Sequence, residues 1–74
     1  MSEIFIDTPH ITVGQFLKHV SIISSGGEAN FFIQENKIII NNDKNKAITR
    51  GVKLFDNDLI FINDSAYKIK HMSN

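Results

Sequence analysis

The chain has 74 residues, of which 42% are hydrophobic and none is cysteine, and its eight acidic residues balance its eight basic ones. A chain of this length forms a single domain, residues 1–74, whose core is only one layer deep, so a deep, enclosed active site is not expected. The acidic start and the lack of a long apolar run argue against a signal peptide or a membrane span. We therefore expect a soluble, cytoplasmic protein without disulfides or thiolate zinc sites.

The beginning of the sequence predicts a short strand followed by an amphipathic helix. Residues 4–6 favour an edge strand that ends before Pro9. A helical face follows, because apolar residues then recur at spacings of three and four: Val13, Phe16, Leu17, Val20 and Ile23. Thr12 and Gln15 form a T-x-x-Q capping box, so we predict that the helix begins after Thr12, although Gly14 in its first turn is mildly unfavourable.

The stretch ISSGGEANFF, residues 23–32, places two glycines between two apolar segments. Residues 25–28 match a second capping box, S-x-x-E, which predicts a second helix from about Gly26 to Glu35, ended by Asn36 in the left-handed conformation. We interpret the glycine pair as a helix-to-helix turn. The alternative is a phosphate cradle at the first amides of this helix, which the capping side chains disfavour because they can satisfy the same amides. Phe31 is predicted to belong to the core, with stacking on an RNA base as the alternative.

The remainder of the chain changes from helical to strand periodicity. Runs rich in β-branched and aromatic residues occupy residues 37–41, 59–62 and 66–70, and the last two flank residues 63–65 as in a hairpin. Residues 43–58 are polar and basic, and we predict a loop there. This order gives an α+β fold in which a helix-turn-helix pair packs on one face of a small, mainly antiparallel sheet.

With these elements placed, the chain resembles the S-four RNA-binding domain, which is named after a small-subunit ribosomal protein. The resemblance is strongest to the small stand-alone bacterial proteins of this type, whose words GQFLK, SGG-x-A and RG-x-KL occur here at residues 14–18, 25–29 and 50–54. It covers about residues 10–70. It implies the alpha-L arrangement of helices and strands, and binding to structured ribosomal RNA, or to RNA on the ribosome, in ribosome assembly or rescue.

The chain departs from the family pattern at two kinds of position. Gly26 stands where the family often has Arg, and Asn30 where it often has Lys, so the resemblance implies weakened RNA binding through the second helix. Asn replaces the expected glycine at three turns, represented by Asn36, Asn42 and Asn57. Because Asn tolerates the left-handed conformation, these replacements leave the predicted fold intact.

The charges are unevenly distributed along the chain. Residues 1–36 carry one Lys and four acids, net −3, whereas residues 37–74 carry seven cations and four acids, net +3. We predict a basic rim along the helix pair that meets RNA phosphates, and the resemblance singles out Arg50 and Lys53 within it. Lys44 and Lys46 are interpreted as solvated. The candidate RNA-binding residues are Lys18, Gly26, Gly27, Asn30, Lys37, Arg50 and Lys53.

No catalytic constellation can be recognised in the sequence. The three histidines, His10, His19 and His71, lack the spacing of metal ligands, and no nucleotide-binding glycine motif is present. We therefore predict no enzyme activity, no catalytic residue, no metal and no cofactor. The expected partners of this monomer are structured RNA and the ribosome, with no membrane. The alternative is a protein-interaction adaptor that keeps the fold with weakened RNA binding, because the net charge is zero.

Overall fold

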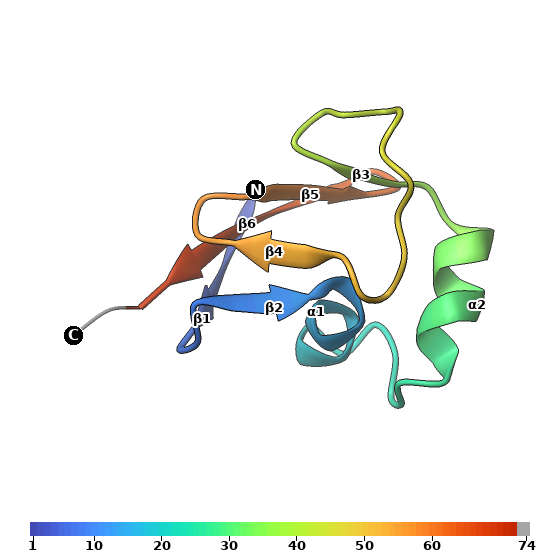
Figure 1. Ribbon diagram of the computed structural model, residues 1–74, viewed down its shortest axis with the longest axis horizontal. Helices are drawn as coiled ribbons and strands as arrows, with labels where there is room; N and C mark the ends of the chain where they lie inside the picture. Colours follow the sequence, from blue (N-terminus) through green and yellow to red (C-terminus); the bar gives the residue numbers. More distant parts are fainter. Residues whose placement is uncertain (73–74) are drawn as a thin grey trace.

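Six strands and two helices follow one another in the computed structural model, which describes residues 1–72 (Figure 1). The strands are β1 (Ser2–Ile6), β2 (His10–Thr12), β3 (Ile38–Ile40), β4 (Lys53–Phe55), β5 (Leu59–Ile62) and β6 (Ser65–His71). The helices are α1 (Val13–His19) and α2 (Glu28–Glu35), and neither is long and apolar enough to cross a membrane. This mixture of helices and sheets confirms the predicted α+β class.

Four of the strands form one sheet in the order β1-β6-β5-β3, and β2 and β4 form a second, two-stranded sheet. In the larger sheet β5 pairs antiparallel with β3 and with β6, whereas β1 pairs parallel with β6. The predicted hairpin is confirmed, because Asn63 and Asp64 connect β5 directly to β6. The predicted edge strand is confirmed as well, because β1 lies at the edge of the sheet.

The prediction of a continuous loop over residues 43–58 is wrong. Strand β4 lies within that segment and pairs antiparallel with β2, a strand that the sequence pattern does not show. Each of these strands has three residues, too few for alternation between apolar and polar side chains to be recognised. Leu54 is fully buried between exposed Lys53 and Phe55, and its partner across the ribbon is Ile11. The ribbon thus attaches this part of the chain to the core.

The core lies between α1 and one face of the larger sheet. Its largest fully buried side chains are Phe16, Leu17, Leu54, Ile60, Ile69 and Val13. The ring of Phe16 on α1 meets the ring of Tyr67 on β6 edge to face, with centroids 5.3 Å apart. Helix α1 covers the face of the sheet that carries Ile60 and Ile69. Because side chains alternate along a strand, the residues between them point to the opposite face.

Helix α1 begins as predicted. The hydroxyl oxygen of Thr12 accepts a hydrogen bond from the Gln15 N–H at 3.2 Å, and the Gln15 side-chain oxygen accepts one from the Thr12 N–H at 2.9 Å. Both halves of the first capping box are therefore present.

The end of α1 differs from the prediction. The apolar stripe runs on to Ile23, yet the helix ends at His19, because Ser21 adopts a left-handed φ of 63°. The N–H groups of Ser21 and Ile22 donate to the carbonyl oxygens of Lys18 and Leu17, which is the Schellman pattern of a helix end. Glycine or asparagine usually occupies the left-handed position, so a serine there gives no recognisable stop signal.

Helix α2 ends at Glu35 as predicted, but Asn36 ends it in a different way. Asn36 is extended, with φ −133° and ψ 156°, so the prediction of a left-handed residue is wrong there. Its side-chain amide instead donates to the carbonyl oxygen of Phe32 at 3.0 Å and satisfies the helix end. By contrast, the residues at the other two turns, Asn41, Asn42 and Asn57, have the expected left-handed φ of 53°, 63° and 71°.

Candidate nucleic-acid interface

The backbone around Arg50 is fastened to the start of α1. The first N–H groups of a helix have no partner within it. Those of Val13 and Gly14 donate to the carbonyl oxygens of Val52 at 2.8 Å and Arg50 at 3.0 Å. In Figure 1 this segment, drawn in yellow, descends between β4 and α2 to reach α1. The Arg50 side chain remains exposed, so a cation extends from a fixed point of the backbone.

Gly14 makes this close approach possible. A Cβ atom added to Gly14 would lie 3.3 Å from the Cβ of Arg50 and 3.4 Å from its carbonyl oxygen. The same Cβ would lie 3.8 Å from the Cβ of Ala29 on α2. Arg50 therefore lies where the first turn of α1 comes close to α2.

Lys53 lies on the same fastened segment. It begins β4, is exposed, and pairs with Thr12 at the start of α1. The neighbouring Leu54 is fully buried, so its side chain anchors the segment to the core. Lys46 lines the same hollow of about 270 Å³ as Lys53, together with Asp43 and Asp58 among others. Lys46 is exposed as predicted, yet it lies beside the candidate site rather than apart from it.

Glu28, rather than Ser25, organises the joint between the helices. Its carboxylate accepts hydrogen bonds from the hydroxyl of Ser24 at 2.8 Å, from the Ser24 N–H at 2.7 Å and from the Ser25 N–H at 2.9 Å. These bonds, that of the Ser24 hydroxyl first, lower the pKa of Glu28 below its ordinary value of 4.5. Helix α2 starts at Glu28, and its N-cap residue Gly27 makes no side-chain capping bond. The predicted start at Gly26 and the predicted Ser25 cap are therefore wrong.

The glycine pair lies open on the surface. A Cβ added to Gly26 or Gly27 would meet nothing within 4 Å, and neither glycine has a positive φ. The amides of Glu28 and Ala29 already donate to the carbonyl oxygens of Ser25 and Gly26, each at 3.2 Å. The exposed Glu28 carboxylate adds a negative charge at this position, which would repel a phosphate. This arrangement favours the turn over the phosphate cradle.

The other predicted residues are exposed but dispersed. Lys18 lies in the last turn of α1, Asn30 lies on α2, and Lys37 follows the end of α2. Helix α2 has eight residues and is therefore about 12 Å long, which separates Lys37 from the glycine pair at its other end. Among residues 1–72, the structure thus brings Arg50 and Lys53 together at the start of α1 and places Lys37 elsewhere.

Phe31 does not belong to the core, and that prediction is wrong. Its side chain is 68% exposed. It follows buried Ala29 by two positions, about 200° around the helix, so it points away from the face that packs. That face is already occupied by Ala29, Phe32 and Ile33. An aromatic ring is therefore presented to solvent on α2.

Sequence reasoning missed the role of Gly14 and the position of Lys46. A glycine inside a helix is unfavourable by about 0.5 to 1 kcal/mol relative to alanine, so its presence in a first turn was a usable signal of close approach. No comparable signal exists for Lys46, whose position depends on the path of an irregular loop.

Comparison with known proteins identifies the family. The model of the S4 domain matches residues 4–70. This chain belongs to the S4 domain family. It is also 42% identical over 61 residues to the probable ribosome maturation protein RlbA of Bacillus subtilis (strain 168), a match that covers 82% of this chain and 83% of that protein. No solved structure matches significantly. The resemblance seen in the sequence, to the S-four domain, is thereby confirmed.

Proposed function

We propose that this protein is a non-enzymatic module that binds structured ribosomal RNA, or RNA on the ribosome, during ribosome assembly. Membership of the S4 domain family and similarity to a probable ribosome maturation protein support an RNA-binding, ribosome-related role. In this proposal the protein acts as a monomer in the cytoplasm. The two helices and their joint, residues 13–35, act as a helix-turn-helix unit that faces the RNA.

The fastening of Arg50 to the start of α1 is the observation that carries the proposal. Hydrogen bonds from Val13 and Gly14 already hold the backbone of this segment in place. Less conformational entropy is therefore lost when RNA binds and orders the segment. Arginine presents a planar fork of N–H donors that matches the oxygens of a phosphate, and Lys53 adds a second cation on the same segment. Lys18 and Asn30 would extend the contact along the helices, and the exposed ring of Phe31 would stack on a base.

One observation favours the alternative function, a protein-interaction adaptor. The net charge is zero, and the joint carries the Glu28 carboxylate and no cation. A basic surface is the usual footprint of an RNA-binding domain, and here it is limited to a few side chains. The two functions differ in their response to salt, because contacts with phosphates release counterions and apolar protein contacts do not.

The test of the proposed function is the double variant Arg50→Gln with Lys53→Gln. Fluorescence anisotropy with a labelled fragment of ribosomal RNA is measured over a range of salt concentrations. The parent protein is expected to lose about 10- to 100-fold in affinity between 50 and 200 mM salt, as for three or four phosphate contacts. The variant is expected to bind more than tenfold more weakly at low salt. In a plot of the logarithm of the binding constant against the logarithm of salt concentration, its slope is expected to be smaller in magnitude by about 1.4 to 1.8.

The matched control is Lys44→Gln with Lys68→Gln, which makes the same change in charge on the loop and on the far side of the larger sheet. Equal losses of affinity in the two double variants would mean that bulk charge, rather than the fastened segment, governs binding. A parent protein that shows no salt-dependent RNA binding would refute the RNA function and favour the adaptor.

A further inference from the structure

The larger sheet has a second face, directed away from both helices. Ile60, Ile62 and Ile69 are buried in the core, so the residues between them point to the other side of the sheet. By the strand registers, this outer face carries Glu3, Phe5, Ile39, Leu59, Phe61, Ala66, Lys68 and Lys70. It combines an apolar strip with charged residues of both signs and lies opposite the side on which the helices pack.

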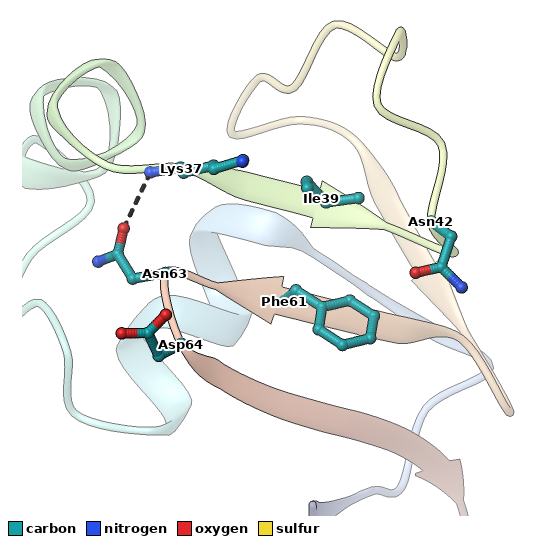
Figure 2. Close-up of a pocket in the computed structure, with 6 residues that line it drawn as sticks. All are labelled: Lys37, Ile39, Asn42, Phe61, Asn63 and Asp64. Carbon is teal, nitrogen blue, oxygen red and sulfur yellow. Dashed lines mark hydrogen bonds between the residues drawn. The ribbon is translucent and has the colours of Figure 1, made fainter.

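One end of this outer face contains a hollow of about 440 Å³, shown in Figure 2. We call it the Phe61 hollow, and it is lined by Lys37, Ile39, Asn42, Phe61, Asn63 and Asp64. Ile39 and Phe61 are partners across β3 and β5 and supply its apolar part. Figure 2 shows Lys37, Asn63 and Asp64 gathered at one end and Asn42 at the other. The volume is within the range of small-molecule sites, about 300 to 1,000 Å³.

The charged end of the hollow is held in place by Asn63. Its N–H donates to the Lys37 carbonyl oxygen at 2.8 Å, and its side-chain oxygen accepts from the Lys37 N–H at 3.1 Å. Its side-chain amide donates to the Asn36 side-chain oxygen at 3.0 Å. The hydrogen-bonding groups of the Asn63 side chain are therefore already engaged within the protein. Among the described residues, the ammonium of Lys37 and the carboxylate of Asp64 remain the charged groups at this end that a ligand can meet.

This combination of groups fits an unpaired nucleobase better than a phosphate. The ring of Phe61 offers a stacking surface, and Lys37 can meet the phosphate of the same strand. The carboxylate of Asp64 repels phosphate and, when ionised, only accepts hydrogen bonds. Guanine presents two adjacent donors, N1–H and N2–H, on its Watson–Crick edge, whereas each other base places an acceptor beside its donor. A carboxylate therefore selects guanine.

We propose that the Phe61 hollow binds one unpaired guanine of an RNA strand, by stacking on Phe61, hydrogen bonding to Asp64 and ion pairing of the strand with Lys37. The inference rests on the proposed function, because it takes RNA as the partner, and it adds a base-reading contact on the face opposite Arg50 and Lys53. The protein would then hold structured RNA on its helical side and a single-stranded guanine on its sheet side.

The test uses the RNA heptamer 5′-UUUGUUU-3′ and its counterparts with A, C or U at the centre. Two-dimensional amide NMR spectra of the 15N-labelled protein are recorded during each titration. The guanine heptamer is expected to bind about tenfold more tightly than the others and to shift the amides of residues 37–42 and 61–66. Asp64→Asn is expected to remove the preference for guanine. Phe61→Leu keeps an apolar side chain and is expected to lower the affinity for all four heptamers at least fivefold.

Phe5→Leu is the matched control, because Phe5 lies on the same face of the sheet but on β1 and outside the hollow. It is expected to leave heptamer binding unchanged. Amide shifts centred on residues 50–53, or a guanine preference that survives Asp64→Asn, would overturn the inference. If the heptamer binds as expected but structured ribosomal RNA does not bind, the proposed function fails and the hollow stands. If structured RNA binds through Arg50 and Lys53 while no heptamer shifts the amide signals of residues that line the hollow, only the proposed guanine site is refuted.

Discussion

Gly14 weakens α1 as a helix but allows the chain at Arg50 to approach it. The N–H of Gly14 donates to the Arg50 carbonyl oxygen at 3.0 Å, and a Cβ at Gly14 would lie 3.4 Å from that same oxygen. A side chain here would therefore compete with the hydrogen bond that fastens the segment. The position of the candidate RNA-binding cation thus depends on an atom that glycine lacks.

Gly14→Val is expected to displace residues 50–52 from the start of α1. The added branched side chain overpacks the contact with Arg50 and Ala29, so the free energy of unfolding is expected to fall by about 1 to 3 kcal/mol. RNA affinity is expected to fall together with stability, because Arg50 loses its fixed position. Urea unfolding and RNA anisotropy measure the two effects.

Gly26→Ala provides the comparison for stability, because a Cβ there meets nothing within 4 Å. Its effect on the unfolding free energy is expected to stay within about 0.5 kcal/mol. A Gly14→Val protein as stable as the parent would show that the close approach to Arg50 does not constrain the fold.

The two capping boxes of the sequence have different outcomes in the structure. T-x-x-Q forms at α1, whereas S-x-x-E does not place Ser25 at the N-cap of α2. An ionised carboxylate is the stronger acceptor, and Glu28 collects N–H and hydroxyl donors from Ser24 and Ser25. The joint is therefore built around a charge, and its stability depends on the ionisation of that charge.

Glu28→Gln is expected to destabilise the fold at neutral pH and to have progressively less effect in acid. The pKa of Glu28 is lowered in the folded protein, so its ionised form contributes stability that is fully present above the unfolded value of 4.5. That contribution is lost as the pH falls through the lowered folded value. Urea unfolding of parent and variant between neutral pH and about pH 3 measures the difference, which is expected to narrow below pH 4.5.

Ser25→Ala is the control for this experiment. The Ser25 hydroxyl makes only a 3.4 Å contact with Glu28 and caps no amide. Its removal is therefore expected to cost less than the 0.5 to 2 kcal/mol typical of a lost N-cap, that is, at most about 0.5 kcal/mol. A Glu28→Gln effect that stays constant down to the lowest pH would contradict the role assigned to the carboxylate.

Periodicity in the sequence predicts the longer elements but not the short ones. Both helices and the strands β1, β3, β5 and β6 follow from local patterns of apolar residues. The two-stranded sheet of β2 and β4 does not follow from such patterns. The formation of strands of only three residues depends on pairing with the neighbouring strand rather than on their own sequence. The end of α1 at left-handed Ser21 was likewise not recognisable, since a serine rather than a glycine or asparagine occupies the left-handed position.

The same distinction applies to the candidate site. Arg50 and Lys53 were found from the sequence because a family word marks them and because exposed cations are easy to recognise. Their position at the start of α1 was not predictable, since it requires Gly14 and residues 50–52 to meet across a large separation in sequence. Phe31 was misplaced because the general tendency of aromatic residues to be buried was weighed above its position off the stripe of Ala29, Phe32 and Ile33.

The zero net charge of the protein conceals an uneven distribution of charge along the chain. The net charges of −3 and +3 in the two halves of the sequence cancel only in the sum. The fold brings the basic segment with Arg50 and Lys53 onto the start of α1, in the acidic half of the chain. Because charges are screened over about 8 Å at physiological salt, an RNA phosphate responds to this local arrangement rather than to the total.

Leu54 connects the candidate site to the stability of the entire domain. It is fully buried and belongs to the same core cluster as Phe16, Ile60 and Ile69. A domain of this size has a stability of about 4 to 11 kcal/mol. Leu54→Ala is expected to remove about 2 to 5 kcal/mol of it by leaving a cavity. Since 1 kcal/mol shifts the melting temperature of so small a domain by about 4 to 8 °C, the shift is expected to be at least about 8 °C.

Thermal unfolding of Leu54→Ala is followed by circular dichroism and by release of labelled RNA, with Lys53→Ala as the surface control. If the fastened segment and the core form one cooperative unit, both signals change at the same lowered temperature. Lys53→Ala, in contrast, is expected to change stability by no more than about 0.5 kcal/mol while still weakening RNA binding. Release of RNA from Leu54→Ala well below an unchanged melting temperature would show instead that the β2 and β4 ribbon opens independently of the core. The Arg50 segment would then be a separately unfolding part rather than a fixed support for its cations.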